Sequence, residues 1–345
     1  MATSQLDAIS DGLDKSRLGA FLARSLPGDW GRLSATPFVG GQSNPTYLLA
    51  AGPERYVLRK QPAGTLLPSA HAVDREYRIM AALAPTGVAV PRVRLFSDDR
   101  GIVGTPFYVM DFVNGRLFRD PLLGELESDE RAAVHDAMND MLARLHHVDP
   151  AAHGLGDYGK AGDYFARQIA RWSRQYRESE TQPIAAMDEL IRRLPGLIPD
   201  DGRVAIAHGD YRLENLLFHP DRPEVLAVLD WELSTLGHPL ADLAYNCFCY
   251  HLPERAFHGL ADRDLAGSGV PCEEEYVARY VARTGRPLDA PWGHYMAFAL
   301  FRLAAILQGV LRRALDGQAA SPDSLQRGAL AGLCAEAGLA ALDRK

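Results

Sequence analysis

The stretch RVAIAHGDYRLENLLFHPD (residues 203–221) places a polar segment between two short apolar runs. The apolar runs have the composition of buried strands, and the segment that separates them carries His208, Asp210 and Asn215. Asp and Asn are both common in turns because their side chains bond to nearby backbone. Taken alone, the stretch is therefore as consistent with a polar turn as with a functional loop.

A second acidic residue downstream favours the functional interpretation. The run EVLAVLDWE (residues 224–232) is apolar until it ends in Asp230. The pattern H-x-D-x-x-x-x-N, followed by an Asp at the end of an apolar run, resembles the catalytic and metal-binding segments of protein kinases and their small-molecule relatives. Phosphoryl transfer needs a carboxylate near the acceptor hydroxyl and oxygen ligands for Mg²⁺. Asp210 can supply the first, and Asn215 and Asp230 the second.

A kinase-type chain also needs a strand lysine and a helix glutamate before this loop. In RYVLRK (residues 55–60), strand alternation places Leu58 and Lys60 on one face. In the helix expected over about residues 69–84, Glu76 lies within the apolar stripe, where an unpaired carboxylate is costly. We therefore predict that Lys60 pairs with Glu76 and that Leu58 and Lys60 lie at the nucleotide; the alternative is a solvated surface pair.

Two further segments of the first third have positions that suit a nucleotide. VGGQSNPTYLL (residues 39–49) can form a turn over phosphates, with Gly41, Ser43 and Asn44 as the contacting residues, although a plain hairpin is equally consistent. FYVMDFVNG (residues 107–115) is predicted to be the strand that leads into the inter-lobe hinge. Its Met110 would border the adenine pocket, and the backbone of Asp111 to Val113 would hydrogen-bond the base.

Length and composition set the remaining limits. A chain of 345 residues suggests two sub-domains, and the 47% hydrophobic and 23% charged residues are those of a globular protein. A net charge of −7 argues against a nucleic-acid partner. The sequence shows neither an apolar run long enough for a membrane span nor a secretory signal, so we predict a cytoplasmic location. Four cysteines without a CxxC pair favour buried thiols over metal or redox chemistry. GLGDYG (residues 154–159) fits GxGxxG but follows no strand, which disfavours dinucleotide binding.

The order of elements predicts an α+β, bilobal protein kinase-like fold. A helical extension is expected over residues 1–30, and a small antiparallel-sheet N-lobe with one helix over 31–114. A larger, mainly helical C-lobe follows over 115–345, with Ser128 as the N-cap of its first helix. The sequence does not indicate the oligomeric state.

At this point the chain is identified as resembling the aminoglycoside phosphotransferase-like (choline kinase-like) family. The resemblance is closest to the kinase-like domain that occurs fused to acyl-CoA dehydrogenases. The segments that carry it are GGQSNPTYLL, LGDYGKAGDYFARQIARWSRQY, HGDYRLENLLF, VLDWELSTLGHPLADLAY and FALFRLAAILQGVLRRAL. They span about residues 38–316, and we expect no dehydrogenase part in this chain.

The resemblance implies ATP- and Mg²⁺-dependent transfer of the γ-phosphoryl group to a small-molecule hydroxyl. Asp210 would accept the hydroxyl proton, and Lys60, held by Glu76, would contact the phosphates. Asp242 would brace the catalytic loop, and His208 would hold the loop backbone. Arg212 aligns with a lysine that neutralises γ-phosphate charge, although a surface arginine is an equal alternative.

The acceptor is left open by the fold. We expect it to bind among aromatic and basic side chains of the helical part, of which at least half of the aromatics are core residues: Trp172, Tyr176, Phe248, Tyr250, His251, Arg167, Arg171, Arg174 and Arg302. These segments contain few acids, which favours a hydroxyacyl-CoA or hydroxy acid. The alternatives are an aminoglycoside-type antibiotic kinase and a non-catalytic nucleotide-binding regulator.

Overall fold

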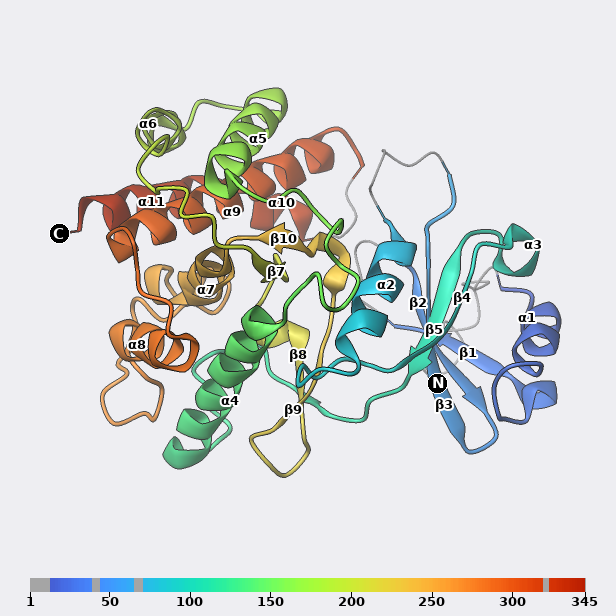
Figure 1. Cartoon of the computed structure of the whole chain (residues 1–345). Coiled ribbons are helices and arrows are strands. Elements are labelled where there is room, and N and C mark those ends of the chain that lie inside the picture. The colour runs from blue at the N-terminus through green and yellow to red at the C-terminus, as the bar shows by residue number, and fades with distance from the viewer. Residues whose placement is uncertain (1–12, 39–43, 65–70, 319–322, 345) are drawn as a thin grey trace, which may run out of the picture. The chain divides into compact units, whose positions relative to one another are not determined.

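The computed structural model describes residues 13–38, 44–64, 71–318 and 323–344 of the chain. The chain separates into two compact units (Figure 1). Unit 1 comprises residues up to Pro85 and Val90–Asn114, and unit 2 comprises Thr86–Ala89 and the chain from Gly115 onward. Residues 86–89 belong to unit 2 because Ala89 accepts a backbone hydrogen bond from Val228, on a strand of that unit (2.9 Å).

Unit 1 is built on a five-stranded antiparallel sheet with the order β1-β2-β3-β5-β4. Its strands are β1 (Ser34–Pro37), β2 (Thr46–Ala51), β3 (Glu54–Lys60), β4 (Val93–Ser97) and β5 (Phe107–Asp111). The helices are α1 (Lys15–Leu22), α2 (Val73–Leu83) and α3 (Arg100–Val103), with the short 3-10 helix η1 (Trp30–Arg32). Helix α2 packs on β4 and β5.

The two faces of this sheet have different neighbours. One face packs against α1 and α3 and forms the main core of unit 1, which includes Leu18, Leu22, Leu58, Val103 and Phe107. The residues next to Leu58 on β3 point to the opposite face because side chains alternate along a strand. Residues 1–12 of the expected helical extension lie outside the described residues, and α1 packs as part of unit 1.

Unit 2 is mainly helical and is organised around the long helix α9 (Trp292–Leu315). Against α9 pack α5 (Tyr164–Ser179), α6 (Ala185–Arg193), α7 (Pro239–Cys247), α10 (Ser324–Gly328) and α11 (Ala331–Asp343). Figure 1 shows α9 passing behind α5 and α7. Helix α4 (Ser128–His147) packs on α8 (Glu273–Thr284), and the 3-10 helix η4 (Phe248–His251) follows α7. An α+β fold with a sheet unit and a helical unit is thus confirmed.

By length and composition, α9 is the one helix of the described residues that could cross a membrane. However, 78% of its most apolar window is buried inside the protein. This burial is what the central core helix of unit 2 requires, because five other helices pack on it.

Two predictions about local structure need comment. Ser128 is the first residue of α4 and not its N-cap, which is Glu127; the Ser128 hydroxyl instead donates to Gly267 O (3.3 Å). GLGDYG forms turns between α4 and α5, with no strand before it and no helix beginning within it, so it lacks the strand–turn–helix context of the GxGxxG fingerprint. Gly159 is needed for close packing: a Cβ there would lie 2.7 Å from Leu236 N.

Candidate active site

The stretch that decides the fold forms a loop held by two small sheets of unit 2. Strand β7 (Ala205–Ala207) pairs with β10 (Thr235–Gly237), and β8 (Leu216–Phe218) pairs with β9 (Val225–Val228) and with β6 (Arg116–Leu117). The loop over residues 208–215, which ends in the 3-10 helix η2 (Leu213–Asn215), connects β7 to β8, and Asp230 follows β9. Both polar segments of the sequence pattern therefore leave short buried strands.

Asp210 and Asn215 are in direct contact. The Asn215 amide nitrogen donates to the Asp210 carboxylate Oδ2 and to the Asp210 backbone oxygen, both at 2.8 Å. Because Nδ2 is used in this way, the Asn215 oxygen Oδ1 is the atom that can coordinate a cation. The spacing of five residues thus fixes the carboxylate and the amide to each other, which turn chemistry alone would not require.

Asp230 is tied to the same loop through its neighbour Leu229. Leu229 donates its backbone N–H to Asn215 O (2.8 Å), and its carbonyl faces His208 Nε2 at 2.8 Å. Asp230 itself has φ +64°, ψ +62° and begins the 3-10 helix η3 (Trp231–Leu233). A non-glycine residue in this left-handed region is uncommon, and such residues cluster at functional sites.

The buried Asp242 of α7 braces the loop, as predicted. Its two carboxylate oxygens accept the backbone N–H groups of His208 (2.5 Å) and Gly209 (2.9 Å). Its side chain is 1% exposed, and His146 Nε2 of α4 lies 3.5 Å from it. The His208 ring holds the loop from within, since the Asp210 N–H donates to His208 Nδ1 (3.2 Å).

Arg302 has a different place from the one we expected. It is buried within α9 and donates from Nη2 to the Gly209 carbonyl at 2.6 Å. Its guanidinium also lies 5.0 Å from the ring centre of Tyr245 and 5.6 Å from that of Trp172. Arg302 and Trp172, which we expected at the acceptor, thus pack against each other beside the Gly209 carbonyl, and neither lines the pocket described below.

Tyr245 of α7 completes this support and was not singled out from the sequence. Burial and the negative charge of Asp210 raise the pKa of the Tyr245 hydroxyl, which places a neutral, buried phenol near the Asp210 side chain. No periodicity marks this residue, because it lies within a run of buried residues along α7.

Gly209 occupies the position that holds an arginine in protein kinases. It has φ +83°, and a Cβ there would lie 2.7 Å from the carbonyl oxygen of Leu233. Both the left-handed backbone and the close approach of the Asp230 loop therefore require glycine. Trp231 is 1% exposed and donates its indole N–H to Val228 O (2.9 Å), which anchors that second loop inside unit 2.

Arg212 lies beside Asp210 without a close contact to it. Its Nε is 3.9 Å from Asp210 Oδ1, and its Nη2 is paired with Glu214. The side chain is 22% exposed, so it is neither a free surface arginine nor a core residue. The structure thus leaves its predicted role as a charge stabiliser open.

In unit 1, Glu76 is buried as predicted, but its partner is Arg59 and not Lys60. Arg59 Nε lies 2.8 Å from Glu76 Oε2, and Glu76 also accepts bonds from Tyr108 OH (2.9 Å) and Asn44 Nδ2 (2.7 Å). Lys60 Nζ donates to Val103 O at 2.5 Å. The predicted Lys60–Glu76 pair is therefore wrong.

The physical reason is the direction in which the side chains of β3 point. Leu58 is fully buried in the core face, opposite to α2, and Lys60 shares that face. Arg59 points to the α2 face, where Glu76 needs a cation. Burial lowers the pKa of the Lys60 ammonium. The places predicted for Leu58 and Lys60 at a nucleotide do not agree with this packing.

The other predicted nucleotide residues have mixed outcomes. Gly41 and Ser43 lie outside the described residues. The Asn44 side chain is 1% exposed and is occupied with Glu76 and with His71 Nδ1 (3.1 Å), so it braces the acid instead of facing a phosphate. Met110 lies on β5 in register with Val57, on the α2 face.

The predicted base-binding backbone is partly used within unit 1. Asp111 donates its N–H to Arg92 O (2.9 Å), and Phe112 donates to Arg55 O (3.4 Å). The Asp111 carboxylate pairs with Arg94 at 2.6 and 2.8 Å. Among the residues that the structure describes, Val113 is the one member of this stretch whose N–H has no backbone partner, so it alone can serve as the predicted donor.

The oxygen donors of unit 2 suit a magnesium ion. Mg²⁺ is usually held by one or two protein ligands together with phosphate and water oxygens. Within the described ranges, no three His, Cys, Asp or Glu side chains are grouped so that they could hold a metal ion by themselves. An amide oxygen of Asn215 next to the Asp230 loop is such a partial donor set, and it fits the ion.

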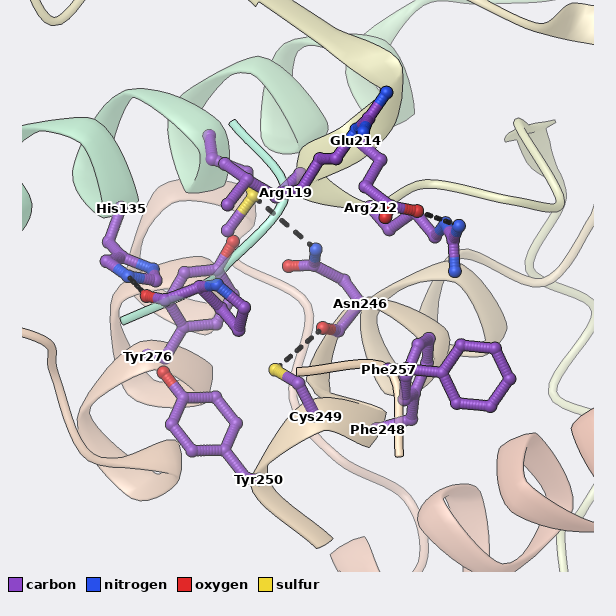
Figure 2. Close-up of a pocket in the computed structure, with 13 residues that line it drawn as sticks. Arg119, His135, Arg212, Glu214, Asn246, Phe248, Cys249, Tyr250, Phe257 and Tyr276 are labelled. Carbon is purple, nitrogen blue, oxygen red and sulfur yellow. Dashed lines mark hydrogen bonds and ion pairs between the residues drawn. The ribbon is translucent and has the colours of Figure 1, made fainter. Parts of the chain in front are cut away.

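A small pocket of unit 2 has the loop residues Arg212, Leu213 and Glu214 in its lining (Figure 2). Its volume is about 40 Å³, and it is lined by Arg119, Pro121, His135, Met138, Arg212, Leu213, Glu214, Asn246, Phe248, Cys249, Tyr250, Phe257 and Tyr276. Of the aromatic residues expected at the acceptor, Phe248 and Tyr250 line it. Tyr176 is fully buried elsewhere, and His251 pairs with Glu273 (2.8 Å).

Two of the four cysteines have the burial that the sequence predicted. All four are free; Cys247 and Cys334 are buried, Cys249 is partly buried and Cys272 is exposed. Burial raises the pKa of the Cys249 and Cys334 thiols to about 12, and it also raises the pKa of the Cys247 thiol. Thiols of raised pKa carry little thiolate and are poor nucleophiles.

Comparison with known proteins agrees with this geometry. Residues 34–280 match the model of the phosphotransferase enzyme family. The chain belongs to this family. It is also 50% identical over 308 residues to acyl-CoA dehydrogenase family member 10 of Mus musculus, covering 89% of this chain and 29% of that protein. The chain spans less than half the length of the curated relatives that it matches.

Solved structures confirm the kinase-like fold. A candidate aminoglycoside phosphotransferase from Ralstonia eutropha JMP134 has a TM-score of 0.87 and 45% identity, covering 96% of this chain and 98% of that one. A ternary complex of aminoglycoside phosphotransferase APH(4)-Ia with ADP and hygromycin B has a TM-score of 0.63 at 14% identity. That likeness covers 95% and 99% of the two chains and shows the fold alone.

Proposed function

We propose that this chain is a kinase that uses Mg²⁺ and ATP to phosphorylate a hydroxyl of a small molecule. The observation that carries the proposal is the fixed contact of Asp210 with Asn215, on a loop whose backbone Asp242 holds. Membership of the phosphotransferase family supports the reaction class. The complex of APH(4)-Ia with ADP supports an adenine nucleotide as the donor.

In this reaction Asp210 is the catalytic base. Its carboxylate accepts the proton of the acceptor hydroxyl while the acceptor oxygen bonds to the γ-phosphorus and the bond to the ADP oxygen breaks. Asn215 fixes the direction of that carboxylate through the 2.8 Å hydrogen bond. Arg212, 3.9 Å from Asp210, would offset charge on the phosphoryl group, and such stabilisation is a large part of phosphoryl-transfer catalysis.

The ligands of the nucleotide and the metal follow from the donors described above. Asn215 Oδ1 and Asp230 would hold Mg²⁺, which neutralises phosphate charge when it is bound. In unit 1, we assign the phosphate-binding cation to Arg59, because the buried Glu76 holds its guanidinium at 2.8 Å. Met110 and the backbone of Val113 remain the proposed contacts of the base.

For the acceptor, a hydroxyacyl-CoA or a hydroxy acid is the first choice. The name of the mouse relative, an acyl-CoA dehydrogenase family member, supports an acyl compound. The lining of the pocket in Figure 2 supports it as well, since its single acid, Glu214, is paired with Arg212. A cationic aminoglycoside would need unpaired carboxylates, so an antibiotic kinase is the second choice and a non-catalytic regulator the third.

We also propose a cytoplasmic location. The four cysteines of the chain are all free, which fits a reducing compartment. Separation of cells into fractions, followed by detection of the chain with an antibody, tests this part of the proposal. Recovery with membranes or with a secreted fraction would contradict it.

Nucleotide binding is tested by thermal unfolding with and without Mg²⁺-ATP. A ligand at 100 times its dissociation constant adds about 2.7 kcal/mol to the free energy of unfolding, which raises the melting temperature. Asp230→Ala should abolish this rise. The matched control is Asp221→Ala, an exposed acid on the hairpin that joins β8 to β9, which should leave the rise unchanged.

Catalysis is tested by ATP turnover across hydroxyacyl-CoAs, hydroxy acids, sugars, amino alcohols and aminoglycosides. One acceptor class should stimulate turnover, and Asp210→Asn should lower that rate by about 10² to 10⁴. The variant should retain its thermal response to Mg²⁺-ATP. An enzyme that binds Mg²⁺-ATP, responds to no acceptor and is unchanged by Asp210→Asn would instead be a regulator.

A further inference from the structure

This pocket of unit 2 contains buried polar atoms that have no hydrogen-bond partner among the described residues. His135 Nδ1, Tyr276 OH and Asn246 Oδ1 all line it, and none has a hydrogen-bond partner among the residues that the structure describes. The three side chains are only 2%, 1% and 6% exposed. An unpaired buried polar atom costs about 1–3 kcal/mol, so three at one pocket need an explanation.

The other ring nitrogen of His135 and the amide nitrogen of Asn246 have hydrogen-bond partners. These contacts determine whether the unpaired atoms can donate or accept a hydrogen bond. His135 Nε2 lies 2.9 Å from Pro121 O, and only a protonated nitrogen can bond a carbonyl, so Nδ1 is an acceptor. Asn246 Nδ2 faces Tyr211 O (3.4 Å) and Met138 Sδ (3.6 Å), which leaves Oδ1 as a second acceptor. The Tyr276 hydroxyl can donate or accept, and its ring packs edge-on against His135 at 6.5 Å.

The charges around these atoms select against an ion. Burial lowers the pKa of His135 to about 4, so the ring is neutral near pH 7. The one lining carboxylate, Glu214, is paired with Arg212. An ammonium group would therefore lose its hydration without gaining a counter-ion. A carboxylate could approach Arg119, an exposed residue of the lining, but at the buried atoms it would bring only acceptors to two acceptor atoms.

The pocket is also joined to the catalytic loop. Arg212 and Leu213 form part of its wall, and Arg212 Nε is 3.9 Å from Asp210 Oδ1. Tyr211, next to Asp210, donates its hydroxyl to Met138 O (2.7 Å) and accepts from Asn246. A group bound in this pocket would thus lie against Arg212 and Leu213, two and three residues after the residue that would receive the acceptor proton.

We propose that this pocket is a specificity site that binds an uncharged hydrogen-bond donor, a hydroxyl or an amide N–H, of the acceptor. The donor hydrogen bonds to His135 Nδ1 or Asn246 Oδ1, and the Tyr276 hydroxyl completes the set. Phe248, Phe257 and Tyr250 supply apolar walls for the adjoining carbon chain. A volume of about 40 Å³ has room for a few heavy atoms, since one water needs about 10–15 Å³.

The acceptor role of this pocket rests on the proposed kinase function, but its binding chemistry can be tested without ATP. Protein with ¹⁵N-labelled histidine is titrated with 1-propanol, 2-butanone, propylammonium and propanoate, and the His135 Nδ1 resonance is followed. Only 1-propanol offers an uncharged donor, so it should move this resonance in a saturable way. The other three should bind at least tenfold more weakly.

Two matched tyrosine variants separate binding from folding. Tyr276→Phe removes an unpaired hydroxyl, so the melting temperature should stay the same or rise. The affinity for 1-propanol should fall about tenfold. Tyr250→Phe, on the same pocket, removes a hydroxyl bonded to Pro271 O (2.9 Å), so it should lower the melting temperature and leave 1-propanol affinity unchanged. No response to 1-propanol, a response that does not saturate, or an equal response to propylammonium would overturn the proposal.

The titration also separates this proposal from the kinase function. Saturable binding of 1-propanol that Tyr276→Phe weakens, in a chain without ATP turnover, supports the pocket and contradicts the kinase. If an acceptor stimulates ATP turnover but 1-propanol does not shift the His135 Nδ1 resonance, the kinase function is supported and the proposed role of the pocket is overturned.

Discussion

Glu76 in unit 1 and Asp242 in unit 2 are both buried carboxylates, but they are stabilised by different kinds of hydrogen-bond donor. Each is a carboxylate only 1% exposed, and each is predicted from the sequence to be a structural acid of the site. Glu76 is satisfied by side chains, namely those of Arg59, Tyr108 and Asn44. Asp242 is satisfied chiefly by the backbone N–H groups of two consecutive loop residues.

The difference explains which prediction failed. Backbone donors are present whatever side chains the loop carries, so the contacts of Asp242 depend only on where the chain passes. The partner of Glu76 depends on which side chain of β3 points toward α2. Arg59 and Lys60 are adjacent, both are cationic, and they point to opposite faces.

The largest effect should follow from Asp242→Asn, which changes the carboxylate that accepts hydrogen bonds from the loop backbone. An Asn there keeps one acceptor oxygen but turns an N–H₂ group toward a loop N–H donor. We expect the free energy of unfolding of unit 2 to fall by about 4 kcal/mol, because charged hydrogen bonds and buried ions are costly to remove. Denaturant unfolding and ATP turnover together measure this, and wild-type-like values in both would contradict the bracing role.

Arg59→Met should have the next largest effect. It tests Glu76, the buried acid whose hydrogen-bond partners are side chains. It removes the cation that lies 2.8 Å from the buried Glu76, which costs about 3 kcal/mol, and it should reduce the thermal response to Mg²⁺-ATP. Lys60→Met is the matched control, because within the described part of the chain Lys60 bonds a carbonyl of the same unit; we expect a loss of about 1 kcal/mol or less.

The same pair can be taken further with a double-mutant cycle. Combined with Glu76→Gln, Arg59→Met should show a coupling energy of 1 kcal/mol or more, and Lys60→Met should show none. A larger coupling for Lys60 would restore the original prediction from the sequence.

A smaller effect should appear with pH, because the fully buried histidines of the described chain all lie in unit 2. Burial lowers the pKa of His135 to about 4, and it also lowers that of His146, beside Asp242. The unfolded chain therefore binds protons that the folded unit does not, as the pH falls below about 6.5. The stability of unit 2 should be complete above this pH and fall by up to about 3 kcal/mol as the pH approaches 4, owing to His135.

Chemical denaturation at pH 7 and at pH 4.5 measures this slope. His135→Gln should flatten it, whereas changing the half-buried His71 in unit 1 to Gln should not. An unchanged slope in His135→Gln would show that its ring is not held neutral.

The smallest effect should come from Tyr245→Phe, which removes a buried hydroxyl near the Asp210 carboxylate but keeps the ring beside Arg302. Loss of one polar contact is worth about 1 kcal/mol, so turnover should fall by about five- to tenfold with little change in melting temperature. A change in the Michaelis constant for ATP with an unchanged turnover number would argue against a positioning role.

The sequence alone determined much of this protein. The apolar runs around residues 203–231 and the H-x-D-x-x-x-x-N spacing indicated a kinase-type loop, and the family comparison agrees with them. The motif and its loop could be predicted because they depend on local spacing. The bracing role of Asp242 came instead from the family resemblance, and the structure agrees with it because Asp242 bonds backbone groups that every residue provides.

Only the tertiary structure decided which side chains meet. It replaced Lys60 by Arg59 at Glu76, placed Arg302 at the Gly209 carbonyl, and brought His135, Asn246 and Tyr276 to one pocket. Residues 135, 246 and 276 come from three separate helical regions, and no spacing in the chain relates them. Periodicity records whether a residue is buried, but the partner of a buried polar group depends on how distant elements pack.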